Sequence, residues 1–279
     1  MRRLLVLFLF FSIACAGFRL ESLEVTVSSI QKDGTATVNE RIKLIIEGNS
    51  SKDLYDSGYA GNNTLAFWSM HTQIKDVKMH VNSGKVVVQN FRLQPQPQSG
   101  CNPFLNLCHG ELRLSYTASP IIDSTTTGNA ETRIVQGTGL FIVEQYKPRT
   151  RKYSVNPNAF YFTTTEQGGI ILDNNIYFTI ILPENSQVLY EEDINPAPTE
   201  LSGSIPGNVK KLMWNDMVMA KFALTFEVEE SLDKEVTEFF TAMLDNFQNM
   251  LNSQHGLSLI AIIAIIIGTY IYVNTAKKK

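Results

Sequence analysis

The first strands of the chain are visible in the alternation of apolar and polar positions. Leu23, Val25 and Val27 are separated by polar or charged residues, and the same period of two resumes over residues 36–46, after Asp33-Gly34. Two alternating runs on either side of an Asp-Gly pair are a strong signal for a β-hairpin. We therefore expect a hairpin at this point.

One carboxylate interrupts the apolar face of the second strand in this hairpin. Glu40 stands at a position where the alternation calls for an apolar side chain. A buried and unpaired carboxylate is costly, because it loses its hydration without compensation. We therefore expect Glu40 either at the edge of the sheet or paired with Arg41 or another cation.

Strand-like runs continue along the chain. Residues 77–81 and 112–116 alternate, whereas the Gln- and Pro-rich residues 94–100 have the composition of a loop. The polar residues 123–133 then mark a linker or loop between a first β region, residues 17–122, and a second β region, residues 134–230. The two regions form either one large sandwich or two small ones.

The second β region contains four further runs of strand-like sequence. Many short strands at regular spacing, separated by turn signals, are typical of a β-sandwich. The sequence therefore predicts a mainly β fold, with almost no helical periodicity before Ser231. The four runs are RIVQGTGLFIVEQY, NAFYFTTT, NNIYFTIILP and KFALTFEVEE.

The apolar period changes at Ser231, which can serve as a helix N-cap. Asp233 and Glu235 follow in the first turn, where the helix dipole favours acids. Residues 231–254 therefore predict one amphipathic helix, and three roles stay open for its apolar stripe. It can pack on the β domain, lie on a bilayer, or pair with a partner helix. The stripe contains Leu232, Val236, Phe239, Phe240, Met243, Leu244, Phe247, Met250 and Leu251.

A long apolar run follows this helix. Residues 257–273 contain no charged side chain and are followed by the lysines at 277–279. A membrane-spanning helix needs about 20 largely apolar residues, and flanking lysines favour the cytoplasmic side. We therefore predict a transmembrane helix over residues 256–273 and a basic cytoplasmic tail over residues 274–279.

The other end of the chain has the layout of a secretory signal peptide. Arg2 and Arg3 precede an apolar run over residues 4–13, and Ala14-Cys15-Ala16 has the small-residue pattern of a cleavage site. We expect residues 1–16 to be removed. Two alternatives stay open: a lipoprotein cysteine at Cys15, and an uncleaved signal anchor.

The charge of the chain limits its partners. The formal net charge is −3, and five of the bases, Arg2, Arg3 and the lysines at 277–279, lie outside residues 17–273. The expected ectodomain is therefore more acidic than the whole chain. Nucleic-acid binding calls for a basic surface, so we expect no nucleic-acid partner.

Export changes how the cysteines and two asparagines are interpreted. Cys101 and Cys108 form an even pair in the mature chain, and an oxidising compartment favours a disulfide between them. A zinc site with His109 would lack a second pair of ligands. Asn49 and Asn62 each begin a glycosylation acceptor pattern, so both are glycosylation candidates.

The strongest candidate for ligand contact is a cluster of four bases between Tyr146 and Tyr153. It contains Lys147, Arg149, Arg151 and Lys152. Bases beside aromatic rings can hold a phosphate, a sugar acid or an anionic partner, whereas the alternative is a solvated hairpin loop.

Phe240 and Phe247, on the stripe of the amphipathic helix, are the second set of candidate contacts. Both would serve a protein partner. We find no nucleophile with a recognisable base, and no histidine pair at metal spacing: His71 and His80 would face opposite sides of a strand. We therefore expect no catalytic residues, no metal and no cofactor. Gly137 and Gly139 predict a kink or bulge in a strand rather than a phosphate loop.

Two stretches resemble exported, membrane-anchored domains of unknown function from archaea and bacteria. Residues 23–46 resemble the N-terminal strands of those domains, in which a pair such as Asp33-Gly34 precedes a valine-rich strand with a glutamate like Glu40. Residues 181–230 are similar to archaeal surface β-sandwiches through Leu182-Pro183 and Leu212-Met213-Trp214. The resemblance implies the fold and the topology, and it carries no activity and no site residues.

These features together predict a non-enzymatic, type I single-pass membrane protein. Its extracytoplasmic sandwich would bind or scaffold an envelope component at the cell membrane, or at the endoplasmic reticulum membrane if the chain is eukaryotic. The alternative is an accessory subunit of a membrane protein complex, secretory or associated with translocation, that is held through the amphipathic helix and the span.

Overall fold

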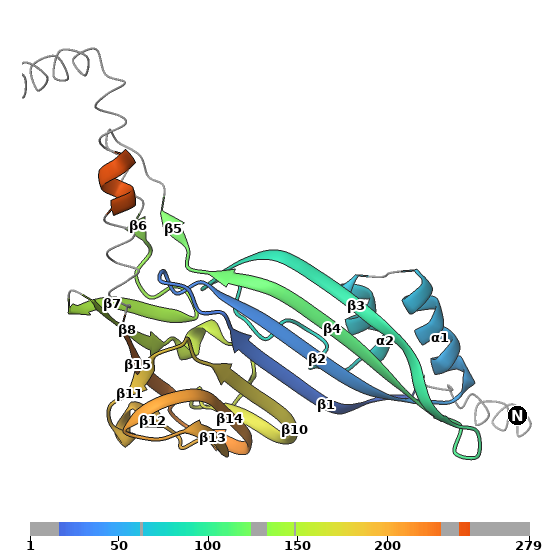
Figure 1. Ribbon diagram of the computed structural model, residues 1–279. Coiled ribbons are helices and arrows are strands. Elements are labelled where there is room, and N and C mark those ends of the chain that lie inside the picture. The colour runs from blue at the N-terminus through green and yellow to red at the C-terminus, as the bar shows by residue number, and fades with distance from the viewer. Residues whose placement is uncertain (1–16, 62–63, 124–132, 148, 230–239, 246–279) are drawn as a thin grey trace, which may run out of the picture. The chain divides into compact units, whose positions relative to one another are not determined.

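The computed structural model describes residues 17–61, 64–123, 133–147, 149–229 and 240–245 (Figure 1). The chain divides into two units, residues 1–229 and 230–279. The first unit is mainly β, as the alternation of its sequence predicts, and thirteen of its described strands belong to one sheet. Two separate sheets that face each other as a sandwich are not confirmed.

The predicted N-terminal hairpin is confirmed. Strands β1 (Gly17–Ser28) and β2 (Ala36–Glu47) pair antiparallel, with Val27 opposite Val38. Gly34 in the turn has a φ of 84°, and a Cβ there would lie 2.7 Å from the carbonyl oxygen of Phe141. The turn therefore needs glycine both for its backbone conformation and for its contact with a strand of the second β region.

The two β regions share the sheet. Strands β3 (Val87–Asn102) and β4 (Leu107–Ser119) extend the first hairpin in the order β3-β4-β2-β1. β1 then pairs in parallel with β10 (Ile170–Ile181), which brings Val25 opposite Phe178. A strand of the first region thus continues directly into the second.

The other strands are short or complete the second region. β10 pairs with β14, and the order continues through β11, β15 and β8 to β7. β5 and β6 form a separate two-stranded sheet. Their bounds are β5 (Ile122–Asp123), β6 (Arg133–Ile134), β7 (Phe141–Lys147), β8 (Thr150–Val155), β9 (Thr163–Thr164), β11 (Ser186–Val188), β12 (Ile194–Asn195), β13 (Glu200–Gly203), β14 (Gly207–Met219) and β15 (Ala223–Glu229), with short 3₁₀ turns at Pro157–Ala159 and Glu191–Asp193.

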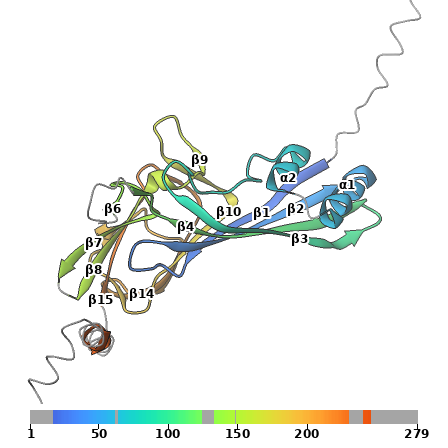
Figure 2. The same cartoon turned by 90° about the horizontal axis from the view of Figure 1, so that it is seen from above.

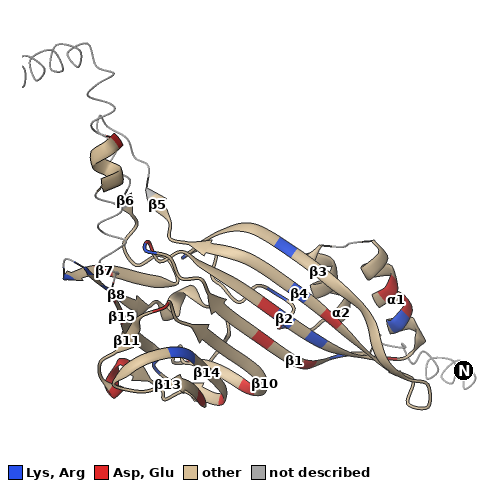
Figure 3. Cartoon of the chain, in the orientation of Figure 1, with Lys and Arg blue, Asp and Glu red and all other residues tan. Residues whose placement is uncertain are grey.

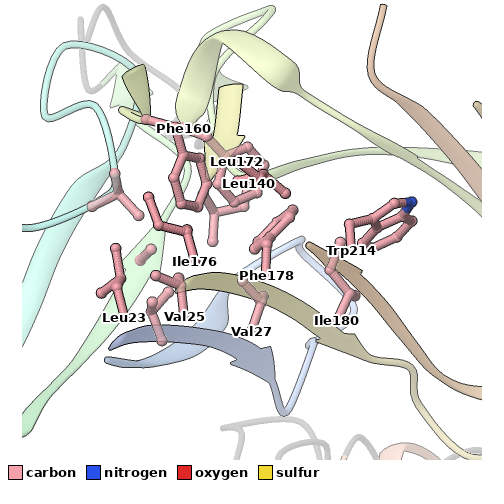
Figure 4. Close-up of a cluster of buried hydrophobic side chains, with 14 of the residues drawn as sticks. Leu23, Val25, Val27, Leu140, Phe160, Leu172, Ile176, Phe178, Ile180 and Trp214 are labelled. Carbon is pink, nitrogen blue, oxygen red and sulfur yellow. The ribbon is translucent and has the colours of Figure 1, made fainter. Parts of the chain in front are cut away.

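An aromatic cluster fills the core beside β1 and β10. Phe178 stacks on Trp214 with ring centroids 5.8 Å apart, and it meets Phe160, Phe162 and Phe222 edge-on. Figure 4 shows Leu23, Val25 and Val27 of β1 beside Ile176 and Phe178 of β10. Burial of large apolar side chains is the main favourable contribution to folding, and here it ties the two β regions together.

Two helices contradict the expectation of an all-β region before Ser231. Helix α1 (Asn49–Ala60) packs on β2 and β3, and helix α2 (Leu65–Thr72) packs on β1. The buried positions of α1 are Ser51, Tyr55 and Gly58. They have helical spacing, but only one of them is large and apolar, so the sequence shows no hydrophobic stripe.

Strand β3 also differs from the prediction, because residues 94–100 belong to it rather than to a loop. Within the described sheet β3 is a terminal strand that pairs only with β4. An edge strand tolerates proline, since one side of its backbone has no ladder to donate to. Pro95 lies opposite Leu112 in this ladder.

Residues 77–81 do not form a strand, although Val77 and Val81 are buried. The only strand-like contact of this segment within the described residues is an isolated bridge from Val81 to Phe160. His80 therefore lies in an irregular segment and His71 lies in α2, so the prediction that they face opposite sides of one strand is wrong.

The irregular segment is held by the carboxylate of Glu40. Glu40 is buried in β2 between two other strands, so the edge position is wrong, and its partner is His80 rather than Arg41. The backbone N–H of His80 donates to Oε1 and its Nδ1 lies 2.8 Å from Oε2. The hydroxyl of Tyr116 also donates to Oε1, and burial followed by the charge of Glu40 raises the pKa of Tyr116.

In the second unit the described residues 240–245 are helical, within the predicted amphipathic helix. No helix among the described residues is long and apolar enough to cross a bilayer. The predicted signal peptide (1–16), span (256–273) and tail (274–279) all lie outside the described residues.

The Glu40 cluster predicts a large effect of substitution on stability. Glu40→Ala removes the acceptor of three buried donor groups and should lower the free energy of unfolding by about 3–5 kcal/mol. Glu40→Gln keeps the shape and one acceptor and should cost less. Urea unfolding of the full chain measures both, with the exposed neighbour Asn39→Ala as the control, expected within about 0.5 kcal/mol of wild type. Equal losses of unfolding free energy in Glu40→Ala and Asn39→Ala would contradict the role assigned to Glu40.

Candidate functional site

The tip of the β3–β4 hairpin exposes two large apolar side chains. Phe104 is 97% exposed and Leu105 is 70% exposed. Cys101 and Cys108 close the hairpin as a disulfide, with their Cα atoms 4.1 Å apart. The predicted pairing of the two cysteines is therefore confirmed. Neighbouring apolar side chains that stay in water mark interaction sites more often than isolated ones.

Local sequence explains the shape of this tip. The side-chain oxygen of Asn102 accepts hydrogen bonds from the backbone N–H groups of Phe104 and Leu105, at 2.9 and 3.2 Å. Asn106 takes a φ of 48°, a left-handed conformation that asparagine tolerates better than most residues. The turn therefore holds the two apolar residues at its outermost point.

Helix α1 braces the base of the tip. The ammonium group of Lys52 donates to the side-chain oxygen of Asn106 at 2.8 Å, and the N–H of Gly48 donates to the carbonyl of Asn106 at 3.0 Å. Nε2 of Gln98 in β3 lies 2.9 Å from the carbonyl oxygen of Lys52. These contacts connect the start of the helix to β3 and to the turn of the hairpin.

Tyr55 anchors the middle of α1 to the same hairpin. Its hydroxyl lies 2.7 Å from the carbonyl oxygen of Gln96, and it accepts from the N–H of Glu111 at 2.9 Å. A Cβ at Gly110 would lie 2.4 Å from the Tyr55 ring, so this position needs glycine. Burial raises the pKa of Tyr55 to about 12, and the hydroxyl therefore stays protonated at neutral pH.

The solvent face of β1, β2 and β4 carries a chain of ion pairs. Lys43 and Arg41 both approach Glu24, at 3.4 and 3.8 Å, and Arg41 and Arg113 both bind Glu111. Figure 3 shows acids and bases interspersed over these strands. Because the charges alternate, this face is polar without a dominant sign.

Glu111 is the most enclosed carboxylate of this chain of ion pairs. Burial alone would raise the pKa of its carboxyl, but the hydrogen bonds and charges of Arg41 and Arg113 outweigh it and hold the pKa below the ordinary value. The hydrogen bond to Glu111 raises the pKa of Arg41 in turn, against the opposing effect of desolvation. The charged forms of both groups are therefore favoured.

The four predicted bases lie together on the β7–β8 hairpin, and carboxylates face Lys152 and Arg149. The register places Lys152 between Glu144 of β7 and Glu227 of β15. Arg149 lies 3.9 Å from Glu229, and Arg151 donates to the carbonyl of Lys32. The ammonium group of Lys147 lies 4.7 Å from the ring centre of Tyr146.

A small pocket beside this hairpin is lined in part by Tyr146, Lys152, Tyr190, Asp193 and Glu227. One base and two acids share it, so the pocket is not a simple anion site. Acids beside the bases weaken the positive electrostatic potential of this hairpin. The β7–β8 hairpin therefore resembles a solvated hairpin more than a dedicated phosphate-binding loop.

The remaining candidate residues fall in different places. Phe240 is 55% exposed in the helical residues 240–245, whereas Phe247 lies outside the described residues. Asn49 is exposed as the first residue of α1, and Asn62 lies outside the described residues. Phe240 and the four bases belong to different units.

In the described part of the chain, the histidine and glycines that were considered for metal or phosphate binding make contacts within the protein. No three His, Cys, Asp or Glu side chains gather there at a potential metal site. His109 instead lies 2.8 Å from a carboxylate oxygen of Glu21. Gly137 and Gly139 lie in a turn rather than a strand kink, and both of their carbonyls accept from the side chain of the buried Asn156.

Phe104 and Leu105 were not among the residues that the sequence pattern singled out. The available signal was their position between two cysteines after Asn102-Pro103, where a turn leaves no neighbour to cover them. No protein-family model matches the chain, and no curated protein matches it.

The disulfide makes a testable contribution to stability. Replacing Cys101 and Cys108 by serine removes a small closed loop, for which the chain-entropy relation gives about 2–3 kcal/mol. Unfolding midpoints of the full chain should show this loss, and a reductant should lower the wild-type midpoint while leaving the double variant unchanged. If the reductant lowered the unfolding midpoint of both proteins, its effect would not come from the Cys101–Cys108 disulfide.

The ion-pair chain predicts a specific pH dependence. Because the folded pKa of Glu111 is depressed, its contribution is present above the unfolded value, 4.5, and is lost as the pH falls through the lower folded pKa. Glu111→Gln should therefore cost about 1 kcal/mol at pH 7 and progressively less as the pH falls below 4.5. Exposed Glu184→Gln is the control, and a loss of stability that does not depend on pH would refute the assignment.

Proposed function

We propose that this chain is a non-enzymatic, type I single-pass membrane protein whose exported β domain binds or scaffolds another envelope component. The observation that carries the proposal is the β3–β4 hairpin, where the Cys101–Cys108 disulfide supports an exposed Phe104. Disulfides persist mainly in exported proteins, and an exposed aromatic side chain on a braced turn suits recognition of a partner. The proposal assigns no reaction to the chain.

The membrane part of the proposal comes from the sequence. The apolar residues 257–273 and the lysines after them support an anchor with a short cytoplasmic tail, and residues 1–16 support export. Within this proposal the β domain is one large sandwich. The continuous cluster of buried side chains that runs from Leu23 through Phe178 to Phe226 supports that architecture.

The alternative, an accessory subunit of a membrane complex, is favoured by one observation. In the described helical residues of the second unit, Phe240, Met243 and Leu244 are 55%, 56% and 67% exposed. An apolar stripe of this kind can pair with a partner helix near a bilayer. The proposed function and the alternative differ in which part of the chain holds the partner.

Membrane fractionation of the full chain tests the proposed topology. The chain should remain in the membrane pellet after alkaline carbonate washing, and a variant that ends at residue 255 should be released. In sealed vesicles with the cytoplasmic side outward, protease should remove only the short tail. Cys101 and Cys108 should react with a thiol reagent only after reduction. Release of the full chain by carbonate, or thiols that react without reductant, would refute the proposal.

Co-purification after gentle solubilisation separates the two candidates. Loss of a constant partner in Phe104→Ser/Leu105→Ser, but not in Phe240→Ser/Phe247→Ser, supports the proposed function. The reverse result supports the accessory-subunit alternative. Loss in neither variant would exclude both sets of contacts.

A further inference from the structure

The apolar tip is held in one shape before any partner arrives. The disulfide closes its base, Asn102 caps its turn, and Lys52 and Gly48 both bind Asn106. Preorganised contact residues lose less conformational entropy on binding than flexible ones. Phe104 and Leu105 are therefore suited to enter a pocket as a rigid unit.

Acidic side chains surround the base of the tip. Glu47 ends β2 directly opposite Leu107, and Glu21 binds His109 of β4. Asp53 and Asp56 lie on the first two turns of α1, where Nε2 of Gln98 donates to Asp56 at 2.7 Å. Among the described residues, the lysine and arginine side chains that these contacts show in the same area are Lys52 and Arg19, which pairs with Glu47.

In the described part of the chain, four carboxylates against one lysine and one arginine give this collar a negative sign. Anionic phospholipid headgroups would be repelled by it, and two apolar residues alone bury little surface in a bilayer. A protein surface with lysine or arginine around an apolar pocket complements both the apolar tip and its acidic collar. Charge complementarity therefore favours a protein partner over an anionic lipid surface.

The tip also lies far from the point where the first unit ends. Gly17, Glu47 and Leu107 are in register at the tip end of β1, β2 and β4. The β1–β2 turn, at the other end, contacts the β7–β8 hairpin through Lys32 and Gly34, and there Thr150 pairs with Glu229.

The 12 residues of β1 separate these two ends by roughly 40 Å, at about 3.3 Å per residue. Figures 1 and 2 both place α1 and α2 at one end of the first unit and β7, β8 and β15 at the other. The first unit therefore ends, at Glu229, at the end opposite the tip.

From these observations we infer that Phe104 and Leu105 form a docking finger for a partner protein. The partner would present an apolar pocket for a phenylalanine and a leucine side chain, with lysine or arginine on its rim. The inference rests on the proposed function, because it names the surface with which the exported β domain would bind its partner.

A photo-crosslinking amino acid at position 104 of the full chain, in intact membranes, tests the inference. A matched probe at Val218, which is 59% exposed on β14, is the control. We expect one protein adduct from position 104 and none of the same protein from position 218. The crosslinked peptide of the partner should lie beside lysine or arginine.

Four further measurements identify the contact chemistry. An excess of a disulfide-closed peptide of residues 99–110 should compete for the adduct, whereas the same peptide with both Phe104→Ser and Leu105→Ser should not. Leu105→Ser in the chain should lower the adduct yield at least about ten-fold. Asp53→Lys and about 0.5 M salt should each lower the yield, because they weaken the attraction between the collar and the rim.

The opposing outcomes are equally specific. A phospholipid adduct, a crosslinked dimer of this chain, no adduct, or a protein adduct whose yield Leu105→Ser leaves unchanged would each overturn the docking finger. These results would leave the carbonate and protease results of the proposed function intact. Conversely, a chain that carbonate releases would refute the proposed function whatever position 104 contacts. Leu105 is exposed, so its substitution should not affect folding, and formation of the Cys101–Cys108 disulfide verifies this.

Discussion

The buried carboxylate of Glu40 is the constraint on which the arrangement of the first unit depends. A carboxylate inside a sheet has to be matched by donors, and here the donors come from His80 and Tyr116. The requirement places the irregular segment around His80 on the core side of β2. From there the N–H of Asn82 reaches the carbonyl of Ala159, and His80 accepts from the N–H of Tyr161. A single polar group in the first β region thereby helps to position the aromatic residues of the second.

The same unit combines a long sheet with a braced tip. β1 to β4 extend away from the aromatic core, and strands with few packed neighbours would be free to bend. Helix α1 opposes this through Tyr55, whose buried hydroxyl binds backbone groups of both β3 and β4. The disulfide fixes the remaining turn. The contacts of Tyr55 and the disulfide therefore hold the exposed pair Phe104 and Leu105 in place at this end. At the other end, neighbouring acids balance the charge of the basic β7–β8 hairpin.

Much of the β architecture could be predicted from local pattern. The alternation around Asp33-Gly34 specified the first hairpin, and the runs at 112–116, 174–183 and 221–230 all lie in strands β4, β10 and β15 at least in part. The failures share a cause. α1 buries mainly small residues against a sheet, β3 accepts prolines because it lies at an edge, and the segment 77–81 exchanges a strand ladder for a bond to Glu40. In each case, contacts with residues far away in the sequence outweigh the secondary structure that the local sequence favours.

The sequence by itself determined the strand-rich character, the pairing of Cys101 with Cys108 and the apolar runs at both ends, because each depends on residues close together in the chain. Only the tertiary structure decided that β1 pairs with β10, that His80 matches Glu40 and that Phe104 stays uncovered. These features depend on contacts between residues tens of positions apart, or on the lack of such contacts within the described part of the first unit. Periodicity records which face of an element is apolar, but it does not record what that face will meet.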